Sequence, residues 1–154
     1  MTITVGTRFV IAERIVRRDH LHGAWWPHTT DLLRELDPML KRALTRVHTV
    51  LGLTLSRTDW PTAPLMYQPN PGRLPKISWY GLSEPNMAIM HASGNNRIAL
   101  LLIPPDTPED VAVTAMLMTT SPGNCLDTTQ TLAKARERAA SAYPSLDATD
   151  TTAR

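Results

Sequence analysis

The run His22-Gly23-Ala24-Trp25-Trp26-Pro27 places two of the chain's four tryptophans side by side, between a glycine and a proline. Gly23 permits backbone angles that other residues avoid, and Pro27 pushes the residue before it toward an extended conformation. Successive side chains of an extended segment point to opposite sides. We therefore expect the two indoles to point apart, one into the core and the other into a surface groove.

Hydrophobic periodicity on either side of this run predicts an α+β fold, with a mostly antiparallel sheet of about five strands and three helices largely on one face. Alternation and β-branched residues predict strands at 8–16, 47–55, 76–81, 86–92 and 97–103. Helical spacing predicts helices at 30–46, 108–121 and 128–142. The expected order is therefore β-α-β-β-β-β-α-α.

Four local signals refine this outline. Pro38 should kink or break the first helix, with Asp37 as the cap of its second part. Residues 97–103 are apolar on both faces, which is typical of a strand in the middle of a sheet. Asp127 and Gln130 have the spacing of a capping box for the last helix. Leu51, Leu53 and Leu55 are expected on one side of their strand.

Composition limits the class of protein. The chain has 154 residues, of which 42% are hydrophobic and 19% charged, so we expect one globular domain over 1–145 and a disordered tail over 146–154. No apolar run reaches the ~20 residues that span a bilayer, and no secretory signal is visible, which favours the cytoplasm. Cys125 is the only cysteine, which excludes an intrachain disulfide, and we expect a passive, partly buried thiol.

The chain resembles a family of small, uncharacterised actinobacterial proteins, a domain of unknown function marked by a Gly-Ala-Trp-Trp-Pro segment. The resemblance rests on Gly23 to Pro27, Asp31-Leu32 with Glu35-Leu36, Asp59-Trp60, Trp79, the run Leu101 to Asp106, Ala115-Met116 and Gly123-Asn124. It implies a shared fold and a bacterial cytoplasmic setting, and it brings no activity. His22 stands where the family pattern has Asp, and His28 where it has Arg. If the family uses that acid and base as a pair, this member has altered or lost it.

Aromatic residues gather around two irregular segments, the tryptophan run and the proline-rich loop expected at 59–75. They can be core residues that fix the loops onto the sheet, or they can line a pocket with a few polar groups, as small-molecule sites do. Asp106 follows the central strand, where it can be a functional carboxylate or cap the next helix. The candidate ligand-binding residues are His22, Trp25, Trp26, Trp60, Tyr67, Trp79 and Asp106.

Other chemistries are less favoured. The net charge is only +2, and no nucleic-acid-binding motif is present, so binding of single-stranded nucleic acid beside a basic face is an alternative. Its candidate residues are Arg17, Arg18, Lys41, Arg42, Arg46, Arg73 and Lys76. His20, His22 and His28 lack a carboxylate or cysteine at metal-site spacing, so no metal or cofactor is predicted. No catalytic motif is visible, although a catalytic pair assembled by folding would escape notice.

The sequence therefore predicts a non-enzymatic cytoplasmic binding or regulatory module, with an aromatic groove for a small molecule or a partner peptide. A nucleic-acid-binding accessory protein and an enzyme with a site assembled by folding are the alternatives.

Overall fold

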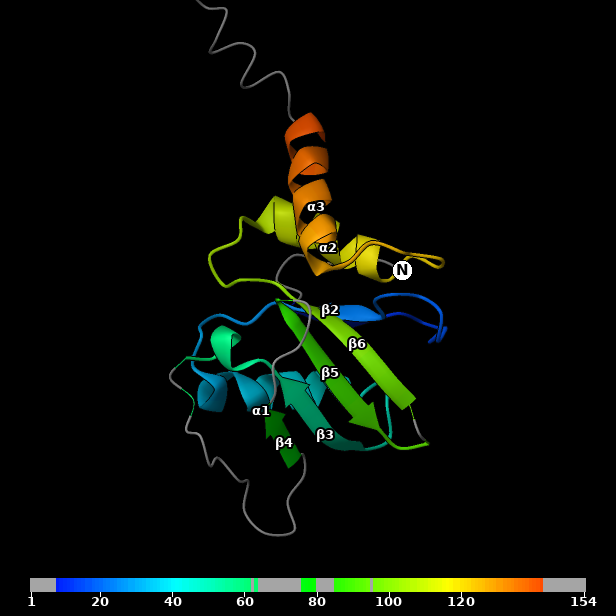
Figure 1. The fold of residues 1–154 in the computed structure, drawn as a ribbon, viewed down its shortest axis with the longest axis vertical. Coiled ribbons are helices and arrows are strands. Elements are labelled where there is room, and N and C mark those ends of the chain that lie inside the picture. The colour runs from blue at the N-terminus through cyan, green and yellow to red at the C-terminus, as the bar shows by residue number, and fades with distance from the viewer. Residues whose placement is uncertain (1–7, 62, 64–75, 80–84, 95, 143–154) are drawn as a thin grey trace, which may run out of the picture.

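A computed structural model describes residues 8–61, 63, 76–79, 85–94 and 96–142. Its centre is a mixed sheet with the order β1-β2-β6-β5-β3-β4 (Figure 1). The pairs β2–β6 and β3–β4 are parallel, and the other neighbouring pairs are antiparallel. The strands are β1 (Phe9–Ile11), β2 (Gly23–Trp25), β3 (Val50–Leu55), β4 (Lys76–Trp79), β5 (Met87–Ala92) and β6 (Asn96–Leu102).

The α+β class is confirmed, but the sheet has six strands in the described residues rather than about five, and it is mixed. The additional strand is β2, formed by the tryptophan run itself. It lies between β1 and β6, antiparallel to the first and parallel to the second. A strand of three residues is too short for alternation to reveal it, which is why the sequence did not predict β2.

The sheet is covered by helices on both faces, which corrects the prediction that they lie largely on one. Helix α1 (Leu32–Ala43) packs on one face, and α2 (Glu109–Thr119) and α3 (Thr128–Ala142) pack on the other, as Figure 1 shows. The central strand β6 divides its side chains accordingly. Ile98, Leu100 and Leu102 join the α1 side, whereas Ala99 and Leu101 join the α2–α3 side. The doubly apolar strand was thus correctly predicted as central.

Helix α1 continues through Pro38, so the predicted break with Asp37 as a second cap is wrong. Proline removes the hydrogen bond to the carbonyl of residue 34. Both Arg34 and Pro38 are exposed, so that carbonyl can be solvated instead. The apolar stripe Leu32, Leu36, Met39 and Ala43 is buried against the sheet and holds the helix together across this point.

Most of the other elements lie where they were predicted but are shorter than predicted. Strand β1 stops at Ile11, and β3 begins at Val50 with an irregular register between Val50 and Gly52, which leaves Leu51 exposed rather than beside Leu53 and Leu55. Helix α3 has the predicted bounds, and its capping box is present. The backbone N–H of Asp127 donates to Gln130 Oε1 at 3.0 Å, and that of Gln130 donates to Asp127 Oδ1 at 2.8 Å. Most of the predicted 59–75 loop and the 146–154 tail lie outside the described residues.

Candidate functional site

Trp25 and Trp26 point to opposite faces of the sheet, as predicted. Trp25 joins the α1 side of the core, and Trp26 joins the α2–α3 side. Neither is exposed, with 2% and 5% of its surface accessible, so the prediction that one lines an open groove is wrong. The polar end of Trp26 is satisfied, because its indole N–H donates to the carbonyl of Pro104 at 3.1 Å. Both rings instead border a small cavity.

This corner cavity has a volume of about 70 Å³ and lies between the β1–β2 edge and α1. Its apolar wall comes from Phe9, Trp25, Trp26 and Met39, and its polar groups come from Arg8, His28, Glu35 and Arg42. A drug-sized ligand needs roughly 300 Å³ or more. The cavity therefore suits a small chemical group rather than a whole ligand of that size.

Arg8 is the central cation of the corner cavity. Its guanidinium carbon lies 3.7 Å from the centroid of the Trp26 ring, and Nη2 donates to the Pro27 carbonyl at 3.4 Å. Its buried Nε has no hydrogen-bond partner among the described residues. Burial lowers the pKa of Arg8 below its ordinary value, while the carboxylates of Glu35 and Glu109 act in the opposite direction. The guanidinium therefore has one buried donor, Nε, that no described residue uses.

Glu35 is a buried carboxylate on α1 that the sequence analysis did not name as a site residue, although it belongs to the segments shared with the family. Its Oε1 accepts the backbone N–H of His28 at 2.9 Å, and Oε2 accepts the hydroxyl of Thr29 at 2.9 Å. The ring Nδ1 of the exposed His28 lies 3.6 Å from Oε1. These bonds hold the segment after Pro27 against α1. The signal was present in the sequence, because Glu35 lies on the buried stripe, between Leu32 and Leu36.

His22 is buried, and both of its ring nitrogens are engaged. Nδ1 accepts the backbone N–H of Ala99 at 3.0 Å, and Nε2 lies 2.9 Å from the carbonyl of Val16. Because the N–H of Ala99 can only donate, Nδ1 is the acceptor and Nε2 carries the proton. His22 thus ties β6 to the loop before β2. Among the described residues, no group of three His, Cys, Asp or Glu side chains is placed to hold a metal ion.

Trp60 and Trp79 also lie on the α1 side, with Trp60 buried and Trp79 partly buried. The Trp60 ring lies 5.1 Å from that of Trp25, at an interplanar angle of 33°. The Arg57 guanidinium lies 5.2 Å from the Trp79 centroid. Around them, Arg57 Nη1, Asp59 Oδ2 and both indole nitrogens are buried without a hydrogen-bond partner in the described part of the chain.

Asp106 is exposed and does not cap the following helix, which rules out one of the two roles expected for it. The N-cap position of α2 is Pro108, with no side-chain cap. The acidic residues of the first turn are Glu109 and Asp110, which suit the positive end of the helix. Tyr67 lies outside the described residues, as does Arg73.

The basic residues predicted for nucleic acid come from several parts of the fold. Arg17 and Arg18 are exposed in the loop before β2, Lys41 and Arg42 are exposed on α1, and Lys76 is on the edge strand β4. Arg46 already has partners, since its guanidinium donates to the carbonyls of Ile11 and Ala12 at 2.9 and 3.1 Å. Strands β1 and β4 are opposite edges of the sheet, so Arg46 and Lys76 belong to different edges.

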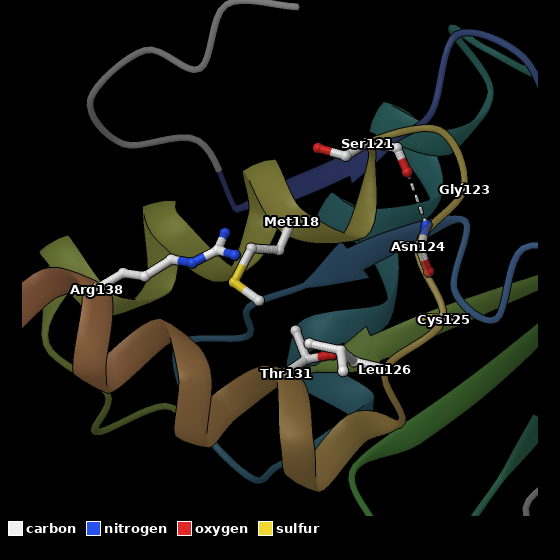
Figure 2. A pocket seen from close by; sticks show the side chains of 8 residues that line it. All are labelled: Met118, Ser121, Gly123, Asn124, Cys125, Leu126, Thr131 and Arg138. Carbon is white, nitrogen blue, oxygen red and sulfur yellow. Dashed lines mark hydrogen bonds between the residues drawn. The ribbon is translucent and has the colours of Figure 1, made fainter.

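Two larger cavities border the loop that follows α2. One of about 220 Å³ lies between the end of α2, this loop and α3 (Figure 2), and its lining includes Cys125, which is exposed rather than partly buried. The other, of about 450 Å³, is lined by the loop before β2 and by Thr120 and Pro122. The sequence reading predicted neither, because each depends on how the segment around residues 119–126 meets distant elements.

Residues 8–119 match a family of unknown function, DUF5994, and the chain belongs to that family. The match includes the whole sheet with α1 and α2, and therefore every residue of the corner cavity. It ends before the loop and α3 that form most of the 220 Å³ cavity. No curated protein and no solved structure matches the chain. Among the described residues, no helix is long and apolar enough to cross a membrane.

Proposed function

We propose that this protein is a non-enzymatic binding module whose corner cavity accepts the carboxylate of a small organic acid or of an acidic side chain on a partner peptide. The observation that supports it best is Arg8. Its guanidinium is stacked on Trp26, is partly buried, and leaves Nε without a partner among the described residues. Buried polar groups are normally hydrogen-bonded, so an unused donor beside a cavity favours a ligand that supplies an acceptor.

The polar groups of the cavity that are still free are hydrogen-bond donors, so they favour a ligand that offers an acceptor. Glu35 already accepts bonds from His28 and Thr29, whereas the side chains of Arg8 and Arg42 keep free donors. Guanidinium groups match carboxylates with paired hydrogen bonds. The apolar wall, which includes Phe9 and Trp25, would contact the carbon atoms next to the carboxylate. This arrangement gives the tryptophan run a role in shaping the site rather than in exposing a groove.

An enzyme has less support. The titratable pair of the corner cavity, Glu35 and His28, is separated by 3.6 Å, which exceeds hydrogen-bond reach, and both Glu35 oxygens are engaged. Nucleic-acid binding stays an alternative prediction, without an observation that favours it. The proposal includes the finer expectations from the sequence: one domain over 1–145, a cytoplasmic actinobacterial protein, and Gly23 to Pro27 as the marker segment of its family.

The test is a titration of the ¹⁵N-labelled protein with acetate and benzoate, followed by NMR of the Arg8 Nε–H and the Trp26 indole N–H. Saturable shifts of both signals are expected. Arg8→Met retains the length of the side chain and should weaken binding about tenfold or more, the usual value of a charge-assisted hydrogen bond. The control Arg17→Met removes an exposed arginine of the loop before β2 and should bind as the wild type does. Equal affinity in Arg8→Met would disprove the site.

A further inference from the structure

The 220 Å³ cavity lies on the opposite side of the sheet from α1, between α2 and α3 (Figure 2). Met118 from the end of α2 and Leu126 from the following loop give it apolar surface. Arg138 reaches across it from α3 toward Met118, as Figure 2 shows. The cavity therefore combines an apolar wall with a cation at one end.

Most other polar groups around this cavity are already used within the protein. Asn124 Oδ1 accepts the backbone N–H of Leu21 at 2.9 Å, and its Nδ2 donates to the Leu21 carbonyl at 2.9 Å. The Thr131 hydroxyl donates to the Asp127 carbonyl, and the Ser121 hydroxyl donates to the Leu117 carbonyl. These groups form the walls of the cavity but have little capacity left for a ligand.

Arg138, in contrast, makes no hydrogen bond or ion pair with any described residue. Lys134 is four residues earlier on the same helix and is also exposed, so it adds positive charge on the same side of α3. A guanidinium with free donors beside an apolar surface matches a carboxylate that carries a hydrocarbon chain or ring. A volume of about 220 Å³ restricts that ligand to a small one.

We infer that the α2–α3 cavity is a second binding site, for a small apolar carboxylic acid whose carboxylate pairs with Arg138 and whose hydrocarbon part contacts Met118 and Leu126. The site is separate from the corner cavity, with which it shares no lining residue. Most of it is formed by residues after 119, beyond the part of the chain that matches the family. Its ligand is therefore expected to distinguish this protein from family members that lack an equivalent loop and α3.

Cys125 gives a direct test, because it is the only cysteine, is exposed and lines the cavity. The rate of its alkylation by N-ethylmaleimide is measured at constant pH with increasing hexanoate, and separately with hexan-1-ol as the uncharged counterpart. Hexanoate should slow alkylation with a saturable dependence, and hexan-1-ol should need about tenfold higher concentration, because it lacks the charge-assisted bond. Equal protection by both compounds, or none by hexanoate, would overturn the inference.

Two matched arginine variants identify the residue that binds. Arg138→Gln should raise the hexanoate concentration needed for half-protection about tenfold, whereas Arg136→Gln, an exposed arginine on the same helix that does not line the cavity, should leave it unchanged. An equal response of the two variants would exclude Arg138 as the carboxylate-binding residue. Arg8→Met, which removes the cation of the corner cavity, should keep the protection of Cys125. The two proposed sites can therefore fail independently.

Discussion

The two ends of β2 are fixed by different kinds of interaction. At its carboxyl end, Trp25 and Trp26 are buried on opposite faces and make ring contacts with Trp60 and Arg8. At its amino end, residues 19–22 carry a dense set of hydrogen bonds in addition to the burial of Leu21 on the α2–α3 side of the core. Asp19 Oδ1 accepts the backbone N–H of Gly123, His20 N–H donates to the Asn124 carbonyl, and the Asn124 side chain pairs with the backbone of Leu21.

This difference explains how a strand of only three residues keeps its register between β1 and β6. Burial of two large rings gives β2 its stability, because apolar burial is strong but not directional. Hydrogen bonds to Asn124 and His22 give it its alignment, because their geometry is narrow. Each proposed binding cavity adjoins one of these ends: the corner cavity includes Trp25 and Trp26, and the α2–α3 cavity includes Asn124. Substitutions at the carboxyl end should therefore change the free energy of unfolding more than substitutions at the amino end do.

The largest expected loss of stability comes from substitutions at the carboxyl end of β2. Trp25→Ala and Trp60→Ala should each lower the free energy of unfolding by about 4 kcal/mol, because each removes a large ring from the core. The double variant should lose less than the sum by about 1 kcal/mol, because the rings contact each other at 5.1 Å. Urea unfolding of the four proteins measures this coupling. Strictly additive effects would show that the two rings are stabilised independently.

Gly23→Ala, at the first residue of β2, should lower the free energy of unfolding nearly as much, by about 3 kcal/mol. A Cβ at this position would overlap the carbonyl oxygen of Val10 and would lie 3.0 Å from the Cα of Ile11, both backbone atoms of β1. The backbone cannot move aside without breaking the β1–β2 pairing.

Gly123→Ala is the control for this substitution. It lies in the loop after α2 at φ +78°, and a Cβ there would meet nothing within 4 Å, so only conformational strain of about 1 kcal/mol is expected. Thermal unfolding compares the two variants. A Gly23→Ala protein as stable as the Gly123→Ala protein would show that β1 can shift away from β2.

These contacts also explain which features could be predicted from the sequence. The apolar stripe of α1, the capping box of α3 and the doubly apolar β6 are local patterns, so they were predicted correctly. The opposite directions of Trp25 and Trp26 followed from extended geometry alone. Burial of both rings was not predictable, because it depends on α1 and α2 covering opposite faces. Arg8 and Glu35 were not predicted as site residues for the same reason, since contacts between separate elements give them their roles.

A smaller loss of stability is expected from substitutions at the amino end of β2. Asn124→Ala removes both partners of the buried Leu21 backbone and should cost about 2 kcal/mol, the usual penalty for buried groups left without hydrogen bonds. Asn96→Ala is the control, because its exposed side chain makes a single hydrogen bond within the described residues, to the Ser93 carbonyl, and the loss should be within about 0.5 kcal/mol. Hydrogen exchange of the Leu21 amide measures the same interaction locally. Unchanged protection of that amide in Asn124→Ala would show that other contacts align the segment before β2.

The smallest expected effect concerns Asp59, which is adjacent to Trp60 at the carboxyl end. Burial raises the pKa of Asp59 above its ordinary value of 3.8, and a hydrogen bond from the backbone of Asn86 lowers it only in part. The folded protein therefore binds a proton at Asp59 more tightly than the unfolded chain does. Stability should decrease as the pH rises from the unfolded pKa through the raised folded pKa, and it should stay lower above that range.

Asp59→Asn removes this charge and should stabilise the protein at pH 7. Its advantage should shrink as the pH falls toward 4, because the wild-type carboxyl of the folded protein is protonated once the pH is below its raised pKa, which removes the cost of burying the charge. Melting temperatures of the two proteins between pH 4 and 7 give the comparison, with Asp37→Asn on the exposed side of α1 as the control. An Asp59→Asn protein that is less stable at pH 7 would mean that the charged carboxylate is favoured in the fold. The packing around Trp60 would then include a favourable charge interaction as well as apolar burial.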